Sequence, residues 1–483
     1  MTTKISLSYG QRRLWTLDRI EQHAATYNMP LALRFTGKLN KEALGQALKL
    51  ITERHESLRT LITESDSGYP IGLLSEGPHF NDLLRVIDLK DEYQAHQHQI
   101  HDITNRLIRE EASTPFNLSN DIPFRATLLE LTSVEHILML TMHHHAGDGS
   151  SWSIIAQELK IAYAAFNRNS LPDFPEPQIQ YSDWARWQET VIKKKLDVKL
   201  VRTKERLSGL PERLTLPLDR PRHADRSHQA GYVQLHIPVH VAQGMESLAR
   251  ELGTTFFTVL LAAYGVFLSR IAGQSTVVIG SPVSGRIRSE VEQTVGFFLN
   301  TLTIPVSTRV QSTARDLVIQ AKHQVESALV DQDIPFELLV EEIGVTRSLD
   351  HTPIFQTMLS YQNQGQADFS LDGTTVEVIP VGMNTTKFDL TLALEPLDSG
   401  DVRGVFEFDA DLFNDSSVNK WSASFSMLLE SMVNTPDSPV MALCMTDASQ
   451  RADIIEESSG PVRDLSSQPL TLAALFAAQV SEP

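Results

Sequence analysis

The feature that most limits how this chain can fold is a junction between an apolar run of strand length and an amphipathic helix. The run Ile137–Met142 is short and bounded by polar residues, as in a buried β-strand. The segment His143-His144-His145-Ala146-Gly147-Asp148-Gly149 follows, and its two glycines allow a sharp loop. A helical pattern then begins near Ser151, and the residues on its apolar face are Trp152, Ile155, Leu159, Ala162 and Phe166. The histidines therefore lie at a strand-to-helix junction, where rigid elements can hold a side chain toward a cleft.

The same alternation of helical and strand patterns recurs along the chain and predicts a mixed α/β fold. Asn40 is a predicted N-cap for a helix with an apolar face that runs from Leu44 to Ile51. Further helices are predicted at 240–253, 256–271 and about 313–330, and further strands at Thr276–Ile279, Thr375–Pro380 and Arg403–Glu407.

The length of 483 residues exceeds one ordinary core and predicts two or three domains. Prolines at 172, 175 and 177 mark a loop after the first half, and a second proline-rich stretch spans Leu214–Pro221. After about residue 446 the chain turns polar and rich in serine, before a short amphipathic pattern at Leu470–Val480. We expect three regions: 1–175 with the histidine loop, 176–445, and a linker region 446–483.

Composition excludes several classes of protein. A net charge of −18 repels phosphate backbones and anionic lipid, so neither nucleic-acid nor membrane binding is expected. The basic cluster at Lys193–Arg206 is read as a solvated helix face, with an acidic partner as the alternative. No apolar run reaches roughly 18 residues, and Met1–Ile5 is too short and polar for a secretory signal. The single cysteine, Cys444, allows no internal disulfide framework, and we expect a cytoplasmic protein.

The histidine loop is the strongest chemical signal. The chain has no dinucleotide fingerprint, phosphate-binding P-loop, serine-hydrolase elbow or HExxH. On extended backbone His143 and His145 share a face and His144 opposes them, so a metal site would need ligands from elsewhere, and none is predicted. One histidine as a base or hydrogen-bond partner, with Asp148 fixing the loop, is the alternative. A structural His–Asp pair that closes the loop stays open beside it.

The order of the motifs resembles the condensation domains of nonribosomal peptide synthetases, within the chloramphenicol acetyltransferase-like superfamily. The HHxxxDG loop at 143–149 resembles their core motif. The other matching segments, in order, are Ser8–Leu17, Arg54–Thr60, Tyr181–Gln188, Ile279–Arg286, Val295–Thr301, Asp331–Glu337, Thr352–Gln356, Lys387–Leu390 and Asp411–Phe413. The segment Leu472–Val480 looks like the start of an adenylation domain. The resemblance therefore covers nearly the whole chain.

The resemblance implies two similar lobes in a V-shaped pseudo-dimer with a central tunnel. A donor acyl thioester and an acceptor aminoacyl thioester would each arrive on the phosphopantetheine arm of a peptidyl carrier protein, with no cofactor bound to the domain itself. His144 would sit beside the attacking amine, and Gly149 would bring its backbone N–H near the reacting carbonyl. The structural roles fall to His143 and to Asp148, which pairs with Arg286 in the family's pattern. Candidates for lining the tunnel are Asn300, Ser150 and Trp152.

One departure from the family pattern, and the position of Met1, leave alternatives open. A tryptophan usually follows Gly149 directly, whereas here Trp152 stands two serines later, which resembles epimerization domains. The Arg54 and Gly296–Thr301 segments resemble condensation domains that take an L-configured donor. If Met1 is the natural start, the donor comes from another polypeptide or as an acyl-CoA in a chain-starting domain. A non-enzymatic domain that only holds carrier proteins is the remaining alternative, and the identity of donor, acceptor and product stays open.

Overall fold

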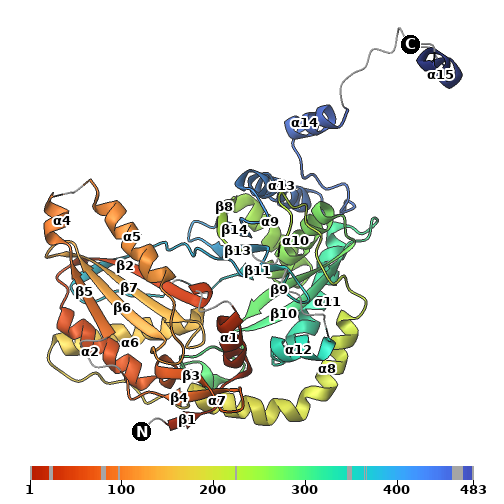
Figure 1. The fold of residues 1–483 in the computed structure, drawn as a ribbon. Helices are drawn as coiled ribbons and strands as arrows, with labels where there is room; N and C mark the ends of the chain where they lie inside the picture. Colours follow the sequence, from red (N-terminus) through yellow and green to blue (C-terminus); the bar gives the residue numbers. More distant parts are fainter. Residues whose placement is uncertain are drawn as a thin grey trace.

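The computed structural model describes residues 3–20, 25–77, 83–95, 98–223, 226–344, 351–363, 365, 367–459 and 471–480. For residues 192–197, 448, 449, 454, 457, 475, 478 and 479 it describes the backbone alone. Two larger sheets carry the fold, one at each side of Figure 1, and helices cover both. This is the mixed α/β architecture that the sequence predicts.

A five-stranded sheet forms the core of the first half, with β7 at its centre. In order across the sheet, its strands are β12 (Thr374–Ile379), β2 (Asn28–Gly37), β7 (Glu135–His143), β6 (Phe124–Glu130) and β5 (Leu84–Asp88). All neighbours are antiparallel except β5 and β6. A strand paired on both sides and covered on both faces must be apolar along its length, which explains the run Ile137–Met142.

Both faces of β7 are buried, but against different helices. Leu138 and Leu140 face a cluster with α2 and α6, whereas Ile137 and Met139 face a cluster with α5. Each buried side chain of this size contributes roughly 1.5–3 kcal/mol, so the alternation fixes the register of β7 and the place where it ends. The helices are α2 (Lys41–Arg54), α5 (Ile100–Ser113) and α6 (Gly149–Asn167).

The second half is built on a six-stranded sheet. In order, its strands are β10 (Asn300–Ser307), β9 (Thr276–Val283), β11 (Thr357–Tyr361), β13 (Leu390–Pro396), β14 (Val402–Asp409) and β8 (Ala230–Ile237). One face packs on α9 (Val239–Glu251), α10 (Phe256–Ala272), α11 (Ala314–Val330) and α13 (Asp415–Asn434). Against the other face, beside β9, lie α8 (Lys193–Leu207) and α12 (Phe336–Ile343).

Several segments connect the two halves. Strand β12 comes from the second half of the chain yet pairs with β2 at the edge of the first sheet. Helix α7 (Tyr181–Trp187), the π-helical turn η3 (Gln188–Ile192) and α8 run on continuously toward the second half (Figure 1). The region boundary at 175 stays a prediction, since the first sheet includes a strand from beyond it.

The remaining elements are short or peripheral. A three-stranded sheet joins β1 (Thr3–Ile5), β4 (Pro70–Leu74) and β3 (Thr60–Glu64). The other elements, in different parts of the molecule, are α1 (Tyr9–Ile20), η1 (Ala25–Tyr27), η2 (Glu56–Arg59), α4 (Lys90–Ala95) and η4 (Ser289–Val291). In the predicted linker region, α14 (Ala448–Ser459) and α15 (Leu472–Val480) extend beyond the two sheets in Figure 1, and residues 460–470 and 481–483 lie outside the described residues.

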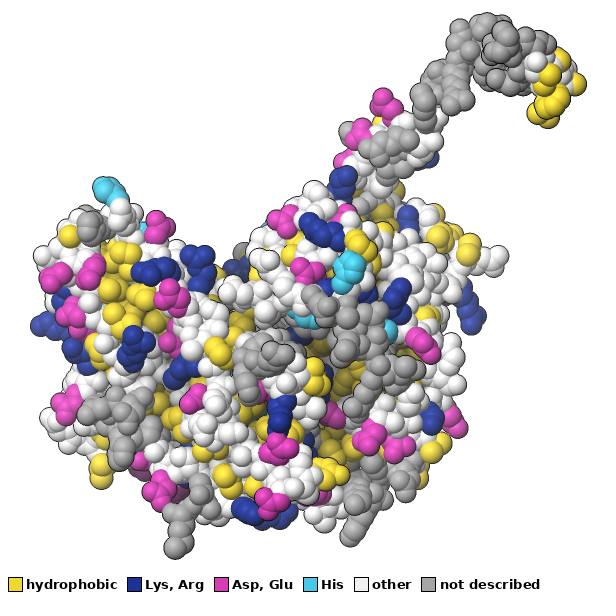
Figure 2. Space-filling view, in the orientation of Figure 1, with side chains coloured by type: hydrophobic (Ala, Val, Ile, Leu, Met, Phe, Trp, Pro, Cys, Tyr) yellow, Lys and Arg dark blue, Asp and Glu magenta, His cyan; other side chains and the backbone are white. Residues whose placement is uncertain are grey.

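The surface matches the charge balance of the sequence. Figure 2 shows Lys and Arg side chains interspersed with Asp and Glu over this face of the molecule, without a continuous basic region. No single helix in the described ranges has both the length and the apolar composition to cross a membrane. Helices α9 and α10 meet the criterion only together, across a bend of 107°.

Candidate active site

The histidine loop joins the central strand β7 to helix α6. The strand ends at His143, residues 144–146 form a turn, and α6 begins at Gly149. Asp148 is the N-cap of α6, with extended backbone and a side chain that accepts a hydrogen bond from the Ser151 N–H at 3.0 Å. A paired strand on one side and a capped helix on the other therefore hold the loop in place.

His144 is oriented by two hydrogen bonds. Its backbone N–H donates to the carbonyl of Tyr27 at 2.8 Å, and its ring Nδ1 lies 2.9 Å from the carbonyl oxygen of Gly147. Because a carbonyl can only accept, Nδ1 carries the proton in this hydrogen bond, and Nε2 of the neutral ring keeps its lone pair. Phe297 packs against the ring at a centroid distance of 4.8 Å. His144 thus offers one defined acceptor atom.

The surroundings of His144 favour the neutral ring. Burial is the main cause that lowers the pKa of His144 to about 3, and the nearby cations of Lys387 and Arg13 act in the same direction. The carbonyl of Gly147 acts in the opposite direction but is outweighed. Part of the side chain remains accessible to solvent, so a substrate can reach it. At neutral pH the site therefore presents an uncharged hydrogen-bond acceptor.

His143, at the end of β7, and His145, in the turn, lie together. Their ring centroids are 4.9 Å apart, and Nδ1 of His143 accepts the backbone N–H of His145 at 3.2 Å. Both rings are buried, and burial lowers both pKa values, that of His145 to about 4. The sequence predicts that these two histidines lie together, as they do, although residues 144–146 form a turn and not the extended backbone on which that prediction is based. Within the described part of the chain, no three His, Cys, Asp or Glu side chains converge as metal ligands do.

Asp148 and Arg286 form a buried ion pair with an Nη2–Oδ1 distance of 3.0 Å. The second carboxylate oxygen of Asp148 accepts the backbone N–H of Phe298 at 3.1 Å. Ser151 joins the network, since its hydroxyl donates to Asp148 at 2.9 Å. The guanidinium of Arg286 stacks over the Phe298 ring at 4.3 Å. Asp148 belongs to the first half and Arg286 to the segment after β9, so this network joins the two halves at the loop.

The two glycines of the loop have different surroundings. A Cβ at Gly149 would meet nothing within 4 Å, whereas a Cβ at Gly147 would lie 2.6–2.7 Å from the end of the Met142 side chain. Gly147 is thus buried against Met142, which leaves Gly149 as the glycine of this loop where backbone is open to a substrate. Gly149 is exposed at the first turn of α6, where backbone N–H groups have no partner within the helix.

The three predicted lining residues have separate environments. The amide of Asn300 donates to the carbonyls of Gln332 and Ile334, and its oxygen accepts the N–H of Phe336. Trp152 is half-buried beside the first core. Ser150 lines an open pocket beside the first turns of α6. The structure thus uses Asn300 to hold the loop before α12, and its role in lining a tunnel stays a prediction.

Some residues that contact the histidine loop, or Phe297 beside it, were not assigned a function from the sequence. Ser151 could have been found, because Asp148-x-x-Ser151 has the spacing of a capping box. Gln11 donates its amide to the carbonyl of His145 at 3.1 Å, and Tyr181 donates its hydroxyl to the carbonyl of Phe297 at 2.6 Å. Neither contact has a local signal, since each joins residues more than 100 positions apart.

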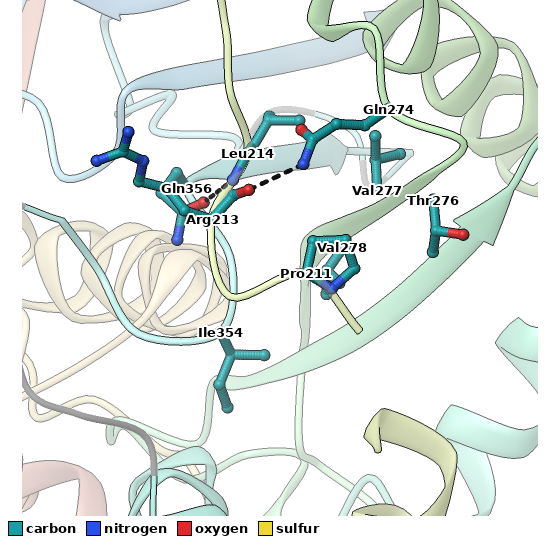
Figure 3. Close-up of a pocket in the computed structure, with 9 residues that line it drawn as sticks. All are labelled: Pro211, Arg213, Leu214, Gln274, Thr276, Val277, Val278, Ile354 and Gln356. Atoms are coloured by element: carbon teal, nitrogen blue, oxygen red, sulfur yellow. Dashed lines mark hydrogen bonds between the residues drawn. The ribbon is translucent and has the colours of Figure 1, made fainter. Parts of the chain in front are cut away.

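Two pockets differ in what they can hold. One, beside β9, has a volume of about 10 Å³, the space of a single water (Figure 3). There Gln356 accepts the N–H of Leu214 at 2.6 Å, and Gln274 donates to the carbonyl of Arg213 at 3.1 Å. This small pocket therefore lies where side chains hold the segment at 213–214 in place, and it is not a substrate site. The pocket beside α6 has a volume of about 350 Å³, within the range of ligand sites.

Comparison with known proteins agrees with this architecture. The family model described as "Condensation domain" matches residues 1–455. The chain is 34% identical over 457 residues to one of the proteins that make up the linear gramicidin synthase of Brevibacillus parabrevis, a match over 94% of this chain and 6% of that protein. It is 30% identical over 456 residues to surfactin synthase subunit 1 of Bacillus subtilis (strain 168), covering 94% of this chain and 12% of that protein. The chain thus spans a small part of each of these relatives.

Solved structures share the fold. A holo four-domain nonribosomal peptide synthetase bound to AMP and glycine superposes with a TM-score of 0.85 at 21% identity, over 100% of this chain and 37% of that one. The X-domain from teicoplanin biosynthesis gives a TM-score of 0.83 at 23% identity, over 92% of this chain and 98% of that one. The chain therefore belongs to the condensation domain family of nonribosomal peptide synthetases.

Proposed function

We propose that this domain forms an amide bond between two carrier-bound thioesters. The amine of the acceptor aminoacyl thioester attacks the donor carbonyl carbon, a C–N bond forms, and the donor C–S bond breaks. The donor carrier leaves as a free thiol that takes up the proton lost by the amine. The observation that carries the proposal is the free Nε2 of a neutral His144, fixed by its Nδ1–H bond to Gly147.

His144 acts in this proposal by orienting the amine. An α-amino group has a pKa of about 7.7–8.0, so removal of a proton from the ammonium by a ring of pKa about 3 would cost roughly 7 kcal/mol. A neutral amine can instead donate a hydrogen bond to Nε2, which aims its lone pair at the donor carbonyl. Positioning of this kind is worth roughly 7–11 kcal/mol, more than proton transfer usually contributes.

The donor carbonyl would lie at the start of α6. Backbone N–H groups in the first turn of a helix that no cap uses point beyond its N-terminal end and carry partial positive charge, which would stabilise the oxyanion that develops on attack. The open space at Gly149 leaves room for the thioester to approach that turn. The ion pair of Asp148 with Arg286 would keep this turn aligned with His144.

We also infer two lobes around a tunnel, with a donor carrier protein at one end and an acceptor carrier protein at the other. The notch between the two sheet-bearing halves in Figure 2 supports this arrangement. We propose a parent chain in which an adenylation domain follows the linker region, because Leu472–Val480 resembles the start of one and the chain spans only 6% of the gramicidin synthase protein that it matches. The regions 1–175, 176–445 and 446–483 are then lobe, lobe and linker.

The test combines the chain with a donor-loaded carrier and an L-aminoacyl-loaded carrier, and weighs both carriers by intact-protein mass spectrometry. The acceptor gains the mass of the donor acyl group with the wild-type chain. His144→Ala lowers the transfer rate by at least about 10²-fold, whereas His323→Ala, at an exposed histidine of α11, leaves it unchanged. Equal rates for wild type and His144→Ala contradict the proposed role.

The same experiment separates the alternatives. Uptake of deuterium at the α-carbon of one loaded carrier, without acyl transfer, identifies an epimerase. Transfer from acyl-CoA but from no carrier identifies a chain-starting domain. Carrier binding without either reaction identifies a docking domain, an outcome to be tested because the X-domain that shares this fold is described in a complex with OxyB.

A further inference from the structure

Tyr181, the first residue of α7, has a buried hydroxyl with two partners from distant parts of the chain. The residue is 2% exposed, and its hydroxyl lies 2.6 Å from the carbonyl oxygen of Phe297 and 2.8 Å from the hydroxyl of Ser8. Because a carbonyl only accepts, the phenol proton goes to Phe297, and the Ser8 hydroxyl donates to the phenol oxygen in return. The hydroxyl of Tyr181 is therefore fixed in direction.

The segment Gly296–Phe298 is held between α6 and α7. On the side of α6, the Asp148 carboxylate accepts the backbone N–H of Phe298 at 3.1 Å. On the side of α7, the Tyr181 ring packs so closely that a Cβ at Gly296 would lie 2.1–2.9 Å from it. The position of this segment therefore depends on Tyr181 as well as on the ion-paired Asp148.

Phe297, in the middle of this segment, connects Tyr181 with His144. The Phe297 carbonyl accepts the phenol proton, and the Phe297 ring packs against the His144 ring at a centroid distance of 4.8 Å. A Cβ at Gly10 would lie 2.7–2.9 Å from the Phe297 ring, so the backbone of α1 packs on it too. A ring packed this tightly limits the orientations open to its neighbour. We propose that Tyr181 is a positioning residue, which acts through Phe297 to hold the ring of His144 with its Nε2 available.

The inference rests on the proposed function only for its consequence in amide transfer. Tyr181→Phe keeps the ring and removes the hydroxyl. Tyr264→Phe is the matched control, because the Tyr264 hydroxyl is equally buried and lies 2.6 Å from the hydroxyl of Thr357, between α10 and β11. We expect similar losses of thermal stability in both variants. Single-turnover transfer should slow on the order of tenfold with Tyr181→Phe and stay within about twofold of wild type with Tyr264→Phe.

A second measurement follows His144 itself, through its reaction with diethyl pyrocarbonate and tandem mass spectrometry of the peptides. This reagent modifies only the neutral imidazole. A ring with a pKa of about 3 is neutral from about pH 5 to 7.5, so the wild-type rate, corrected for reagent hydrolysis, is flat. In Tyr181→Phe the loosened ring meets water, its pKa rises toward 6.5, and the rate falls roughly threefold or more toward pH 5. A residue that only stabilises the fold would not create this step.

A double-variant cycle tests the route through Phe297. Phe297→Leu removes the ring that packs on His144 and should produce the same step. Adding Tyr181→Phe to it should change neither the step nor the transfer rate by more than about twofold, because the ring through which Tyr181 acts is gone. A flat profile in Tyr181→Phe, equal transfer rates in the two tyrosine variants, or additive effects in the double variant would overturn the inference. The step without amide transfer in any variant or in wild type would leave it standing and reject the proposed function.

Discussion

At the scale of single residues, three consecutive histidines have three different environments. His144 keeps one ring nitrogen available through its bond to Gly147, His143 accepts a backbone N–H, and His145 is fully buried. In the described part of the chain neither ring nitrogen of His145 has a hydrogen-bond partner. The chemistry of the loop therefore comes from where the backbone directs each ring rather than from the residue type.

The burial of His145 predicts how stability depends on pH. Its pKa is about 4 when folded and near 6.5 when unfolded, so below pH 6.5 the unfolded chain takes up a proton that the folded chain does not. Stability contributed by this residue is complete above pH 6.5 and falls by about 1.4 kcal/mol per pH unit down to about pH 4.

His145→Leu tests this prediction, since it keeps the apolar volume and removes the titration. Urea denaturation should show a free energy of unfolding at pH 7 that is equal or higher by about 1 kcal/mol, because an unpartnered buried ring is lost. Between pH 6.5 and 4.5 the slope should be shallower by about 1.4 kcal/mol per pH unit. Identical slopes in both proteins would show that His145 is not buried as a neutral ring.

The site could be predicted in part from the sequence. Alternation predicts only that one of the three histidines opposes the other two, and the choice of His144 and the pairing of Asp148 with Arg286 come from the resemblance to condensation domains. The contacts of Phe297 and Gln11 with the loop, and the electrostatic effect of Lys387 on His144, could not be predicted from local pattern, because they join distant parts of the chain. The partners of Asn300 are backbone carbonyls, and no side-chain pattern predicts these.

At the scale of elements, the two glycines of the turn between β7 and α6 are expected to have different roles. Substitution of Gly149 should affect amide transfer, and substitution of Gly147 should affect stability. Gly149→Ala places a methyl group in open space at the first turn of a helix, where alanine is favoured by up to about 1 kcal/mol over glycine. The same methyl group would stand where the donor thioester approaches. We predict an equal or higher free energy of unfolding together with at least about tenfold slower transfer.

Gly147→Ala is the matched variant, and it is expected to lower the free energy of unfolding. Its methyl group would collide with Met142, and overpacking of this kind costs about 1–3 kcal/mol. Thermal or urea denaturation of both variants, beside a transfer assay, separates the two effects. If Gly149→Ala leaves the rate of amide transfer unchanged, the first turn of α6 takes no part in the reaction.

Helices and strands that depend on local sequence pattern could be predicted, whereas the pairing of strands that are far apart in the chain could not. Asn40 caps α2 as predicted, with its oxygen 3.1 Å from the Ala43 N–H, and α9, α10 and α11 lie within a few residues of their predicted bounds. Strand β12 was predicted as a strand, but its partner was not. Its neighbour β2 is more than 300 residues earlier in the chain, so only the folded sheet identifies the pair.

At the scale of the whole molecule, the ion pair of Asp148 and Arg286 links the two halves. Both side chains are buried, with 2% and 7% exposed. Asp148→Asn leaves the guanidinium without its counter-charge, and breaking a buried pair in this way costs about 3–5 kcal/mol. Arg403→Gln breaks an ion pair with Glu395 at the surface and should cost less than about 1 kcal/mol.

Urea denaturation of these two variants gives the comparison directly. A larger loss for Asp148→Asn, accompanied by slower amide transfer, supports a pair that aligns the loop across the halves. Equal losses for the two variants would mean that the buried pair contributes no more than a surface pair.

The measurement that tests the account most directly is the pH dependence of single-turnover amide formation with two acceptors whose amines differ in pKa. If a neutral His144 orients the amine, the rate rises with a midpoint that follows the amine, near pH 7.7–8.0 for an ordinary α-amino group. The midpoint then moves with the acceptor, and no step appears near pH 6.5. A midpoint between pH 6 and 7 that stays fixed when the acceptor changes would show that His144 titrates as a general base, and would contradict the account.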